Sequence, residues 1–282
     1  MTKISSPALR YHGGKFRIAP WIITHMPPHD IYVEPFGGAA GVLLQKTRSH
    51  GEIYNDLDGE VVNFFRIIRN PDTRKQLIEL LAFTPYARSE FELAYMSTEC
   101  PLESARRLVV RAQMAYGSAG ATKSTTGFRI DTKRKYGTSQ QLWAEYPEKL
   151  AIIGQRFQGV LIENRPAIQV MQKHDKSDTL HFVDPPYLTS TRVLNHGKGY
   201  YNHEMTDADH IELLEALKSL KGMVILSGYR SELYKQHLTG WGIRTKPSRA
   251  SAYRGTKMAE EIIWLNPACI DSLRQSAASQ SI

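Results

Sequence analysis

Short hydrophobic runs bounded by glycine, proline or acidic residues recur near both ends of the chain, and each predicts a β-strand. The runs at 179–184 and 223–227 are the most continuous, which is typical of parallel strands buried on both faces. Helical patterns alternate with these runs, for example the helix to 220 that Thr206 and Asp209 would cap. The alternation predicts an α/β fold with helices on both faces of the sheet. The remaining strand candidates lie at 31–33, 52–54, 160–163 and 259–265, and a helix is expected to begin at 41–44.

Residues 61–159 depart from this alternation, because their apolar residues repeat mainly at the spacing of helices. We therefore predict a discontinuous α/β domain over 1–60 and 160–270, a mainly helical insert over 61–159, and a flexible tail over 271–282. The helices expected in the insert span 61–68, 74–81, 90–96 and 102–114, and polar loops are expected at 117–127, 188–205 and 248–257.

The composition is that of a globular protein. The chain has 282 residues, of which 41% are hydrophobic and 23% are charged, so neither a disordered chain nor a fibre is expected. No run of about 18 apolar residues predicts a membrane-spanning helix, and the start of the chain does not resemble a secretion signal. Cys100 and Cys269 lie far apart and outside any metal-binding spacing. This favours reduced thiols in a cytoplasmic protein without a metal site.

The charge favours a polyanionic partner, nucleic acid before an anionic membrane. The formal net charge is +8, and much of the excess lies between 106 and 135, where Asp131 is the single acid. A solvated basic surface would also show this pattern, but the concentration in one segment predicts a phosphate-binding face. The basic residues of this segment are Arg106, Arg107, Arg111, Lys123, Arg129, Lys133, Arg134 and Lys135.

A glycine-rich turn, from Glu34 to Gly41, follows the first predicted strand. In open α/β sheets, ligands bind beyond the carboxyl ends of the strands, and small residues let the backbone approach them. A tight structural turn would have the same composition, but Asp56 at the end of the next strand favours a ligand, because a carboxylate there can accept both hydroxyls of a ribose. The turn lacks the Gly-Lys-Ser/Thr of a triphosphate-binding loop, so it predicts an adenosine-bearing ligand without a triphosphate.

The strongest local signal is Asp184-Pro185-Pro186-Tyr187, directly after a predicted buried strand. Prolines fix the backbone and cannot donate hydrogen bonds, so their carbonyls stay available as acceptors. A carboxylate beside such a carbonyl suits an amino group with two N–H donors, and the tyrosine offers a face for a planar base. The alternative is a strand-terminating turn with an incidental acid.

Taken in order, four motifs resemble those of the DNA adenine-6-amino methyltransferases of the Dam type. The resemblance spans residues 9 to about 265 and matches the group whose target-recognition region lies in the middle, where the basic insert falls. It implies a Rossmann-like methyltransferase sheet with an inserted target-recognition domain, S-adenosylmethionine as cofactor, and double-stranded DNA as partner. The motifs are Leu9 to Phe16 with its Gly-Gly-Lys, Glu34 to Gly38, Asn55-Asp56, and Asp184 to Tyr187.

Carried over by motif, the resemblance assigns a role to each of these residues. Tyr11 and Lys15 would contact the amino-acid portion of the cofactor, Asp56 would hold its ribose, and Asp184 would sit between cofactor and target. The family usually has glycine at the position of Ala40, and alanine costs little there if the backbone angle is ordinary. The pocket would be lined by Glu34, Pro35, Phe36, Gly37 and Gly38.

The implied reaction is methylation of the 6-amino group of an adenine flipped out of the duplex. Asp184 and the Pro185 carbonyl would accept its hydrogens and Tyr187 would stack on the base, without a metal. Pro186 completes the catalytic motif. We expect a monomer with no obligatory protein partner. Three alternatives remain open: an adenine methyltransferase of relaxed sequence preference, a methyltransferase acting on RNA or a protein glutamine, and a DNA-binding regulator that has lost catalysis.

Overall fold

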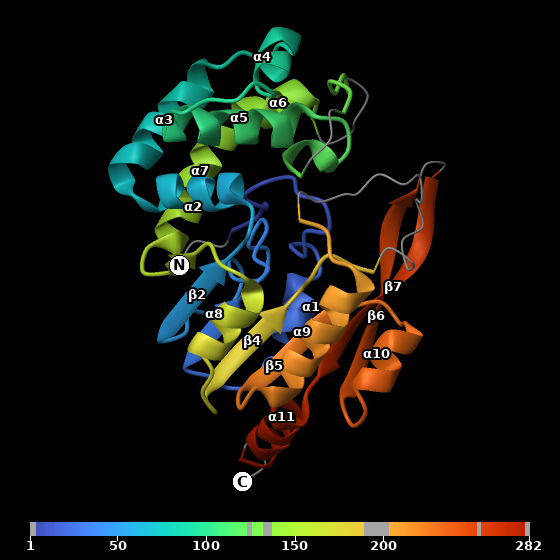
Figure 1. The fold of residues 1–282 in the computed structure, drawn as a ribbon. Coiled ribbons are helices and arrows are strands. Elements are labelled where there is room, and N and C mark those ends of the chain that lie inside the picture. Colours follow the sequence, from blue (N-terminus) through green and yellow to red (C-terminus); the bar gives the residue numbers. More distant parts are fainter. Residues whose placement is uncertain (1–3, 123–125, 132–136, 189–202, 253–254, 280–282) are drawn as a thin grey trace.

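The computed structural model describes residues 4–122, 126–131, 137–188, 203–252 and 255–279, and its described strands form one mixed sheet (Figure 1). The strand order is β3-β2-β1-β4-β5-β7-β6. The first five strands in this order are parallel, whereas β7 runs antiparallel to β5 and β6 antiparallel to β7. The strands are β1 (Ile31–Glu34), β2 (Gly51–Asn55), β3 (Leu161–Glu163), β4 (Thr179–Val183), β5 (Met223–Gly228), β6 (Gly242–Ala252) and β7 (Gly255–Leu265).

The strand order reverses between β1 and β4, and this reversal positions the site. β1 pairs with β2 on one side and with β4 on the other. The loops that follow β1 and β4 therefore diverge, which leaves a crevice between them at the carboxyl ends of the strands. The strands end at Glu34, Asn55 and Val183, which brings the glycine-rich turn, Asp56 and Asp184 to one edge of the sheet. The predicted α/β fold is confirmed.

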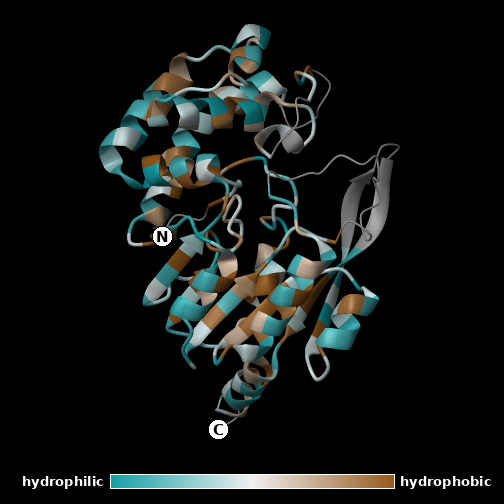
Figure 2. Ribbon diagram, viewed as in Figure 1, coloured by the Kyte–Doolittle hydropathy of each residue, from teal (hydrophilic) through white to brown (hydrophobic). Residues whose placement is uncertain are grey.

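Helices cover both faces of the sheet. On one face, α1 (Ala19–Ile23) and α11 (Pro267–Ser279) pack on inward side chains such as Tyr32, Leu180 and Ile225. On the other face, side chains of the alternate register, such as Val183 and Val224, pack against three helices. Figure 2 shows hydrophobic residues concentrated in the central strands and hydrophilic ones on the outer sides of the helices. The three helices are α8 (Ala167–Lys173), α9 (Asp207–Ser219) and α10 (Glu232–His237).

The segment between β2 and β3 is mainly helical and lies above the carboxyl ends of the strands (Figure 1). Its core is continuous with the sheet, since Phe65 stacks on Phe157 at 4.1 Å between centroids and both contact Tyr54 of β2. The placement fits the predicted insert, although the division of the chain into domains stays a prediction. The helices are α2 (Gly59–Arg69), α3 (Pro71–Phe83), α4 (Arg88–Leu93), α5 (Pro101–Met114), α6 (Ser139–Ala144) and α7 (Tyr146–Phe157), with a 3₁₀ turn, η1, at Ala119–Ala121.

A buried ion cluster joins this insert to the sheet. Glu52 of β2 accepts two bonds from Arg156 of α7, at 2.6 and 2.8 Å, and one from Lys46 at 2.9 Å. All three side chains are almost fully buried. Burial alone would raise the pKa of Glu52, but the bonds from Arg156 and Lys46 outweigh it and hold the pKa below its ordinary value.

Three predicted elements were wrong. Residues 41–45 form successive turns, with bonds to both the third and the fourth preceding residue, in place of a helix. The expected loop at 248–257 overlaps the β6–β7 hairpin, whose backbone pairing continues from Ser248↔Ala259 to Ala252↔Gly255. The expected flexible tail is largely helix α11, because Asn266 Oδ1 accepts from Cys269 N in the first turn and Cys269 is buried in the core.

Among the described residues, no helix is both long and apolar enough to cross a membrane.

Candidate functional site

The turn after β1 is shaped by close contacts that only small residues allow. A Cβ atom on Gly37 would lie 2.1 Å from the Tyr54 ring, and one on Gly38 would lie 3.0 Å from the ring of Tyr11. Gly38 also has φ +45°, and Tyr54 Oη donates to its carbonyl at 2.7 Å. The turn therefore packs on Tyr11 and Tyr54 and also lines a cavity. Its small residues are thus needed for a tight turn, and the turn is also placed where a ligand could bind.

Ala40 in this turn adopts φ +55°, a left-handed backbone conformation. The condition under which alanine would cost little, an ordinary backbone angle, is not met, and the left-handed region disfavours alanine by roughly 1–2 kcal/mol relative to glycine. The strain explains why a glycine suits this position.

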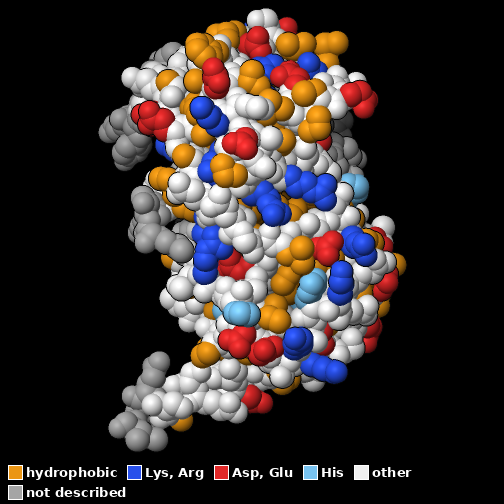
Figure 3. Space-filling model, turned by 90° about the vertical axis from the view of Figure 1, so that its left-hand side faces the viewer, with side chains coloured by type: hydrophobic (Ala, Val, Ile, Leu, Met, Phe, Trp, Pro, Cys, Tyr) orange, Lys and Arg blue, Asp and Glu red, His pale blue; other side chains and the backbone are white. Residues whose placement is uncertain are grey.

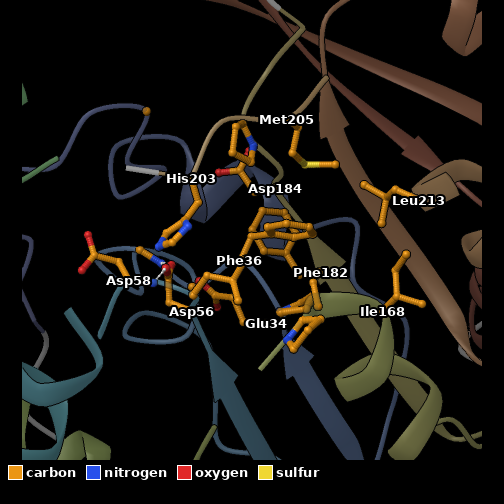
Figure 4. Close-up of a pocket in the computed structure, with 18 of the residues that line it drawn as sticks. Glu34, Phe36, Asp56, Asp58, Ile168, Phe182, Asp184, His203, Met205 and Leu213 are labelled. Atoms are coloured by element: carbon orange, nitrogen blue, oxygen red, sulfur yellow. Dashed lines mark hydrogen bonds between the residues drawn. The ribbon is translucent and has the colours of Figure 1, made fainter. Parts of the chain in front are cut away.

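Asp56 is tied into the same turn. Its Oδ2 accepts from Gly38 N at 2.7 Å and its Oδ1 accepts from Asp58 N at 2.8 Å. Burial raises the pKa of Asp56 to about 6, although both backbone bonds oppose that shift. The carboxylate is thereby fixed at the cavity wall, beside His203 (Figure 4).

Asn55, the residue before it, connects three strand ends and was not among the predicted site residues. Its Nδ2 donates to the carbonyls of Pro35 and Arg165, and its Oδ1 accepts from Arg165 N. The side chain is fully buried, so these bonds satisfy a polar group that would otherwise be costly. A buried asparagine at the end of a predicted strand is the signal that could have found it.

Asp184 follows β4 and pairs with Lys15. Lys15 Nζ lies 2.9 Å from Asp184 Oδ1, donates to the Gly13 carbonyl at 2.9 Å, and sits 4.8 Å from the centroid of the Tyr187 ring. Burial by itself would lower the pKa of Lys15, but the charge of Asp184 together with the contributions of Tyr187 and Glu261 outweighs it and raises that pKa well above its ordinary value. The ammonium therefore stays charged and faces the carboxylate.

Lys15, Asp56, Asp184 and most of the glycine-rich turn border one cavity of about 800 Å³. Figure 4 shows Asp184 on one side, Asp56 and Asp58 on another, and Phe36 with Phe182 between them. Every predicted cofactor residue lines it, as does Pro186, whereas Pro185 and Tyr187 lie outside the lining. The predicted residues in the lining are Tyr11, Lys15, Glu34, Pro35, Phe36, Gly37, Gly38, Asp56 and Asp184.

Comparison with known proteins identifies the family of this site. The family model described as D12 class N6 adenine-specific DNA methyltransferase matches residues 11–246. The chain belongs to this family. The predicted resemblance is thus confirmed.

Two similar proteins are each described as a DNA adenine methylase. One, from Salmonella typhimurium, is 23% identical over 270 residues, which cover 91% of this chain and 94% of that protein. The other, from Salmonella typhi, is 24% identical over 234 residues, covering 81% of this chain and 82% of that protein. A solved structure, a precorrin 8w decarboxylase from Methanobacterium thermoautotrophicum, covers 88% of each chain at 12% identity, but its TM-score of 0.33 is too low to support any conclusion.

The D12 site includes an acidic group with an unusual environment. Glu34 is buried at the end of β1, where its Oε2 accepts from Tyr32 Oη at 2.7 Å and from Leu43 N at 3.0 Å. Burial raises the pKa of Glu34 to about 8, although both bonds oppose the shift. The carboxyl group is therefore protonated in much of the neutral range until a ligand of positive charge comes near.

One wall of the cavity was missing from the sequence prediction. It comes from the loop after β3 and from α8 and α9, and it is mainly apolar near Ile168 and Leu213 (Figure 4). The signal was present in the topology, because the carboxyl end of every parallel strand reaches this edge of the sheet. In the described part of the chain, no three His, Cys, Asp or Glu side chains are grouped as a metal site would need.

The four described arginines predicted to bind DNA are engaged within the insert. Arg106 is 8% exposed and bonds to Glu103, Glu90 and Thr84. Arg111, 9% exposed, donates to the Ala94 carbonyl and to Glu60.

The other two arginines of the group are also held by the protein. Arg107 bonds to Glu103 and to the Met96 and Ser97 carbonyls, and Arg129 is buried beside Asp131. The prediction of these four arginines as phosphate contacts is not kept, because the three on α5 and Arg129 in the loop after η1 bond to neighbouring carboxylates and carbonyls. Lys123, Lys133, Arg134 and Lys135 lie outside the described residues, as does most of the polar loop at 188–205.

Proposed function

We propose that this chain transfers a methyl group from S-adenosylmethionine to the 6-amino group of an adenine everted from double-stranded DNA. The observation that carries the proposal is the single cavity that Asp56, Lys15 and Asp184 share. A catalytic carboxylate on a separate surface would have opposed it. Family membership supports the adenine amino group as acceptor.

The cavity suits the proposed cofactor. The apolar side chains of Phe36, Ile168 and Leu213 would accept a purine ring, and the Asp56 carboxylate would accept hydroxyl hydrogens of a ribose. Tyr11 and Lys15, which also line the cavity, would hold the amino-acid portion. When bound, the cofactor supplies a methyl group already activated by a sulfonium centre.

Asp184 orients the acceptor in this mechanism. Adenine's amino nitrogen is a poor nucleophile because its lone pair is delocalised into the ring. The Asp184 carboxylate and the Pro185 carbonyl would accept its two hydrogens and so favour a tetrahedral nitrogen. The N–C bond would form as the methyl–sulfur bond breaks, and the nitrogen would lose one proton to the Asp184 carboxylate. In-line positioning of this kind contributes up to about 7–11 kcal/mol in favourable cases.

Tyr187 would receive the everted base. Flipping a base from the duplex costs a few kcal/mol, and stacking on an aromatic side chain returns roughly 1–3 kcal/mol. The position of Tyr187, three residues after Asp184 and beside Lys15, supports this assignment.

The test is methyl transfer from labelled cofactor to unmethylated duplex DNA, RNA and protein in parallel. We expect label in DNA alone, at adenines, and mapping the methylated adenines would give the recognised sequence and its stringency. Asp184→Ala should abolish turnover in a protein that still folds, with a lower melting temperature because the buried Lys15 ammonium loses its partner. Asp207→Ala, which changes an exposed residue outside the cavity lining, should keep the turnover. Label in RNA or protein, or full turnover by Asp184→Ala, would contradict the proposal.

Cofactor binding separates the enzyme from a DNA-binding regulator that has lost catalysis. Calorimetry should detect binding of S-adenosylmethionine by the wild type and weaker binding by Asp56→Ala. A protein that binds DNA but no cofactor would favour the regulator.

A further inference from the structure

A polar side chain interrupts the apolar interior of β5, close to the Asp-Pro-Pro-Tyr segment. In Met223–Gly228, Ser227 follows four hydrophobic residues and is 1% exposed. A buried hydroxyl is costly without a partner, so such a serine has a specific contact. Its Oγ lies 3.0 Å from the Tyr187 hydroxyl, forty residues earlier in the chain.

The residue that follows β5 adds a second contact with the Tyr187 ring. Tyr229 lies two residues after Ser227, and its ring meets that of Tyr187 edge-on, at 4.6 Å between centroids and 62° between planes. Edge-to-face aromatic pairs are worth about 0.5–1.5 kcal/mol beyond their buried area.

Lys15 supplies the third contact, with its ammonium 4.8 Å from the Tyr187 centroid. The ring is therefore held by a hydrogen bond at its hydroxyl, an aromatic edge and a cation. Contacts of three kinds fix both the position of the ring and the orientation of its plane. Burial also raises the pKa of Tyr187 well above its ordinary value, so the hydroxyl stays neutral and either hydroxyl can donate in the contact between Tyr187 and Ser227.

We infer that Ser227 and Tyr229 are positioning residues that hold the Tyr187 ring in the plane on which the target adenine stacks. The inference rests on the proposed function and extends it to residues outside the cofactor cavity, since neither residue is in its lining. Ser227 acts through the hydroxyl of Tyr187, and Tyr229 acts through its ring.

A double-mutant cycle tests the role of Ser227. Ser227→Ala and Tyr187→Phe each remove one side of the same hydrogen bond, so each should lower kcat about fivefold. The double variant should lose no more than Tyr187→Phe alone, because that variant has already lost the bond to Ser227 together with the bond to Lys15. The dissociation constant of S-adenosylmethionine, measured by calorimetry, should change by less than about twofold, since the bond lies outside the cavity.

Fluorescence reports on the base itself. With 2-aminopurine in place of the methylated adenine, Ser227→Ala should give a different emission from the wild type, because the everted base stacks less well. Tyr229→Leu should lower kcat by a similar factor, and phenylalanine at position 229 should restore most of the rate because it keeps the ring edge. If Ser227→Ala folds poorly, Tyr187→Phe removes the same bond from the less buried partner.

The outcomes separate this inference from the proposed function. A wild type that methylates DNA, together with Ser227→Ala of equal kcat and equal emission, would overturn the positioning role and leave the function standing. Fully independent effects, about 25-fold in the double variant, would overturn it as well. A wild type that methylates no DNA would overturn both.

Discussion

Burial raises the pKa of two carboxyl groups in the cavity, Glu34 to about 8 and Asp56 to about 6. Both bind a proton more tightly in the folded chain than in the unfolded one, so they favour the fold at low pH. That contribution is lost as the pH rises through 6 for Asp56 and through 8 for Glu34. The site therefore costs stability at neutral pH, as expected where acids are desolvated for binding.

The titration of Asp56 predicts the pH dependence of cofactor binding. The ionised carboxylate accepts ribose hydroxyls best, so affinity should be present above pH 6 and fall as the pH drops through it. At pH 5 we expect S-adenosylmethionine to bind about tenfold more weakly than at pH 7.5. Calorimetry across this range checks the prediction, and Asp56→Asn should remove the step near pH 6. A step of the same size in that variant would contradict the role of Asp56.

The left-handed backbone at Ala40 makes a prediction about stability. Ala40→Gly relieves roughly 1–2 kcal/mol of strain, but it removes a buried methyl worth about 0.8 kcal/mol. It also adds about 0.4–1 kcal/mol of unfolded-state entropy. These terms nearly cancel, so the free energy of unfolding in urea should change by less than about 1 kcal/mol.

Ala105, fully buried in α5, is the matched control for this substitution. Ala105→Gly gains no strain relief and loses both the methyl and helix propensity, so it should cost about 2 kcal/mol. Equal costs at the two positions would show that Ala40 carries no strain.

At the scale of elements, the parts that could be predicted were those with their own periodicity or their own chemistry. The buried strands at 179–183 and 223–228 are recognisable as apolar runs in the sequence, and the capping box of α9 joins Thr206 to Asp209 as expected. The β6–β7 hairpin could not be found this way, because its outer half is polar and is held by backbone pairing across strands.

The residues of the site also divide into those that the sequence could predict and those that it could not. The cofactor residues stand in local motifs, and those that follow β1, β2 and β4 lie at strand ends that the topology brings to one edge. The contact of Ser227 and the wall from α8 depend on residues far along the chain, so no local pattern reveals their role. Asn55 stands in a local motif, but its partners Pro35 and Arg165 lie 20 and 110 residues away.

The ion cluster at Glu52 connects two elements and predicts a large loss of stability. Glu52→Gln would leave Lys46 and Arg156 buried without their shared counter-charge, which typically costs about 3–5 kcal/mol. Urea unfolding at pH 7 measures the loss. Because its bonds hold the pKa of Glu52 below 4.5, its stabilisation is present above that pH and is lost as the pH falls further.

The control is an ion pair of the same chemistry in water. Glu145 pairs with Lys149 at 3.2 Å in an i,i+4 arrangement, and its side chain is 62% exposed. Glu145→Gln should change the free energy of unfolding by less than about 0.5 kcal/mol. Similar costs for the two substitutions would mean that the Glu52 cluster does not fasten α7 to the sheet.

At the scale of the whole molecule, the net charge of +8 does not translate directly into a DNA-binding face. Four of the eight basic residues between 106 and 135 make bonds inside the protein, which leaves Lys123, Lys133, Arg134 and Lys135 as the predicted phosphate contacts. Other Lys and Arg side chains appear at mid-height of the face shown in Figure 3. A basic residue can thus either bond to carboxylates and carbonyls inside the protein or stay available for phosphate, and its burial distinguishes the two cases.

The salt dependence of DNA binding distinguishes these uses. Each phosphate contact releases a counterion and adds about 0.9 to the slope of log affinity against log salt. If Lys133 and Lys135 contact phosphate, Lys133→Gln with Lys135→Gln should reduce that slope by about 1.8 and leave the melting temperature unchanged. Arg106→Gln should do the opposite, because it breaks bonds to Glu90 and Glu103 inside the insert: the melting temperature falls while the slope stays the same. A slope that falls with Arg106→Gln at constant melting temperature would return this arginine to the DNA face.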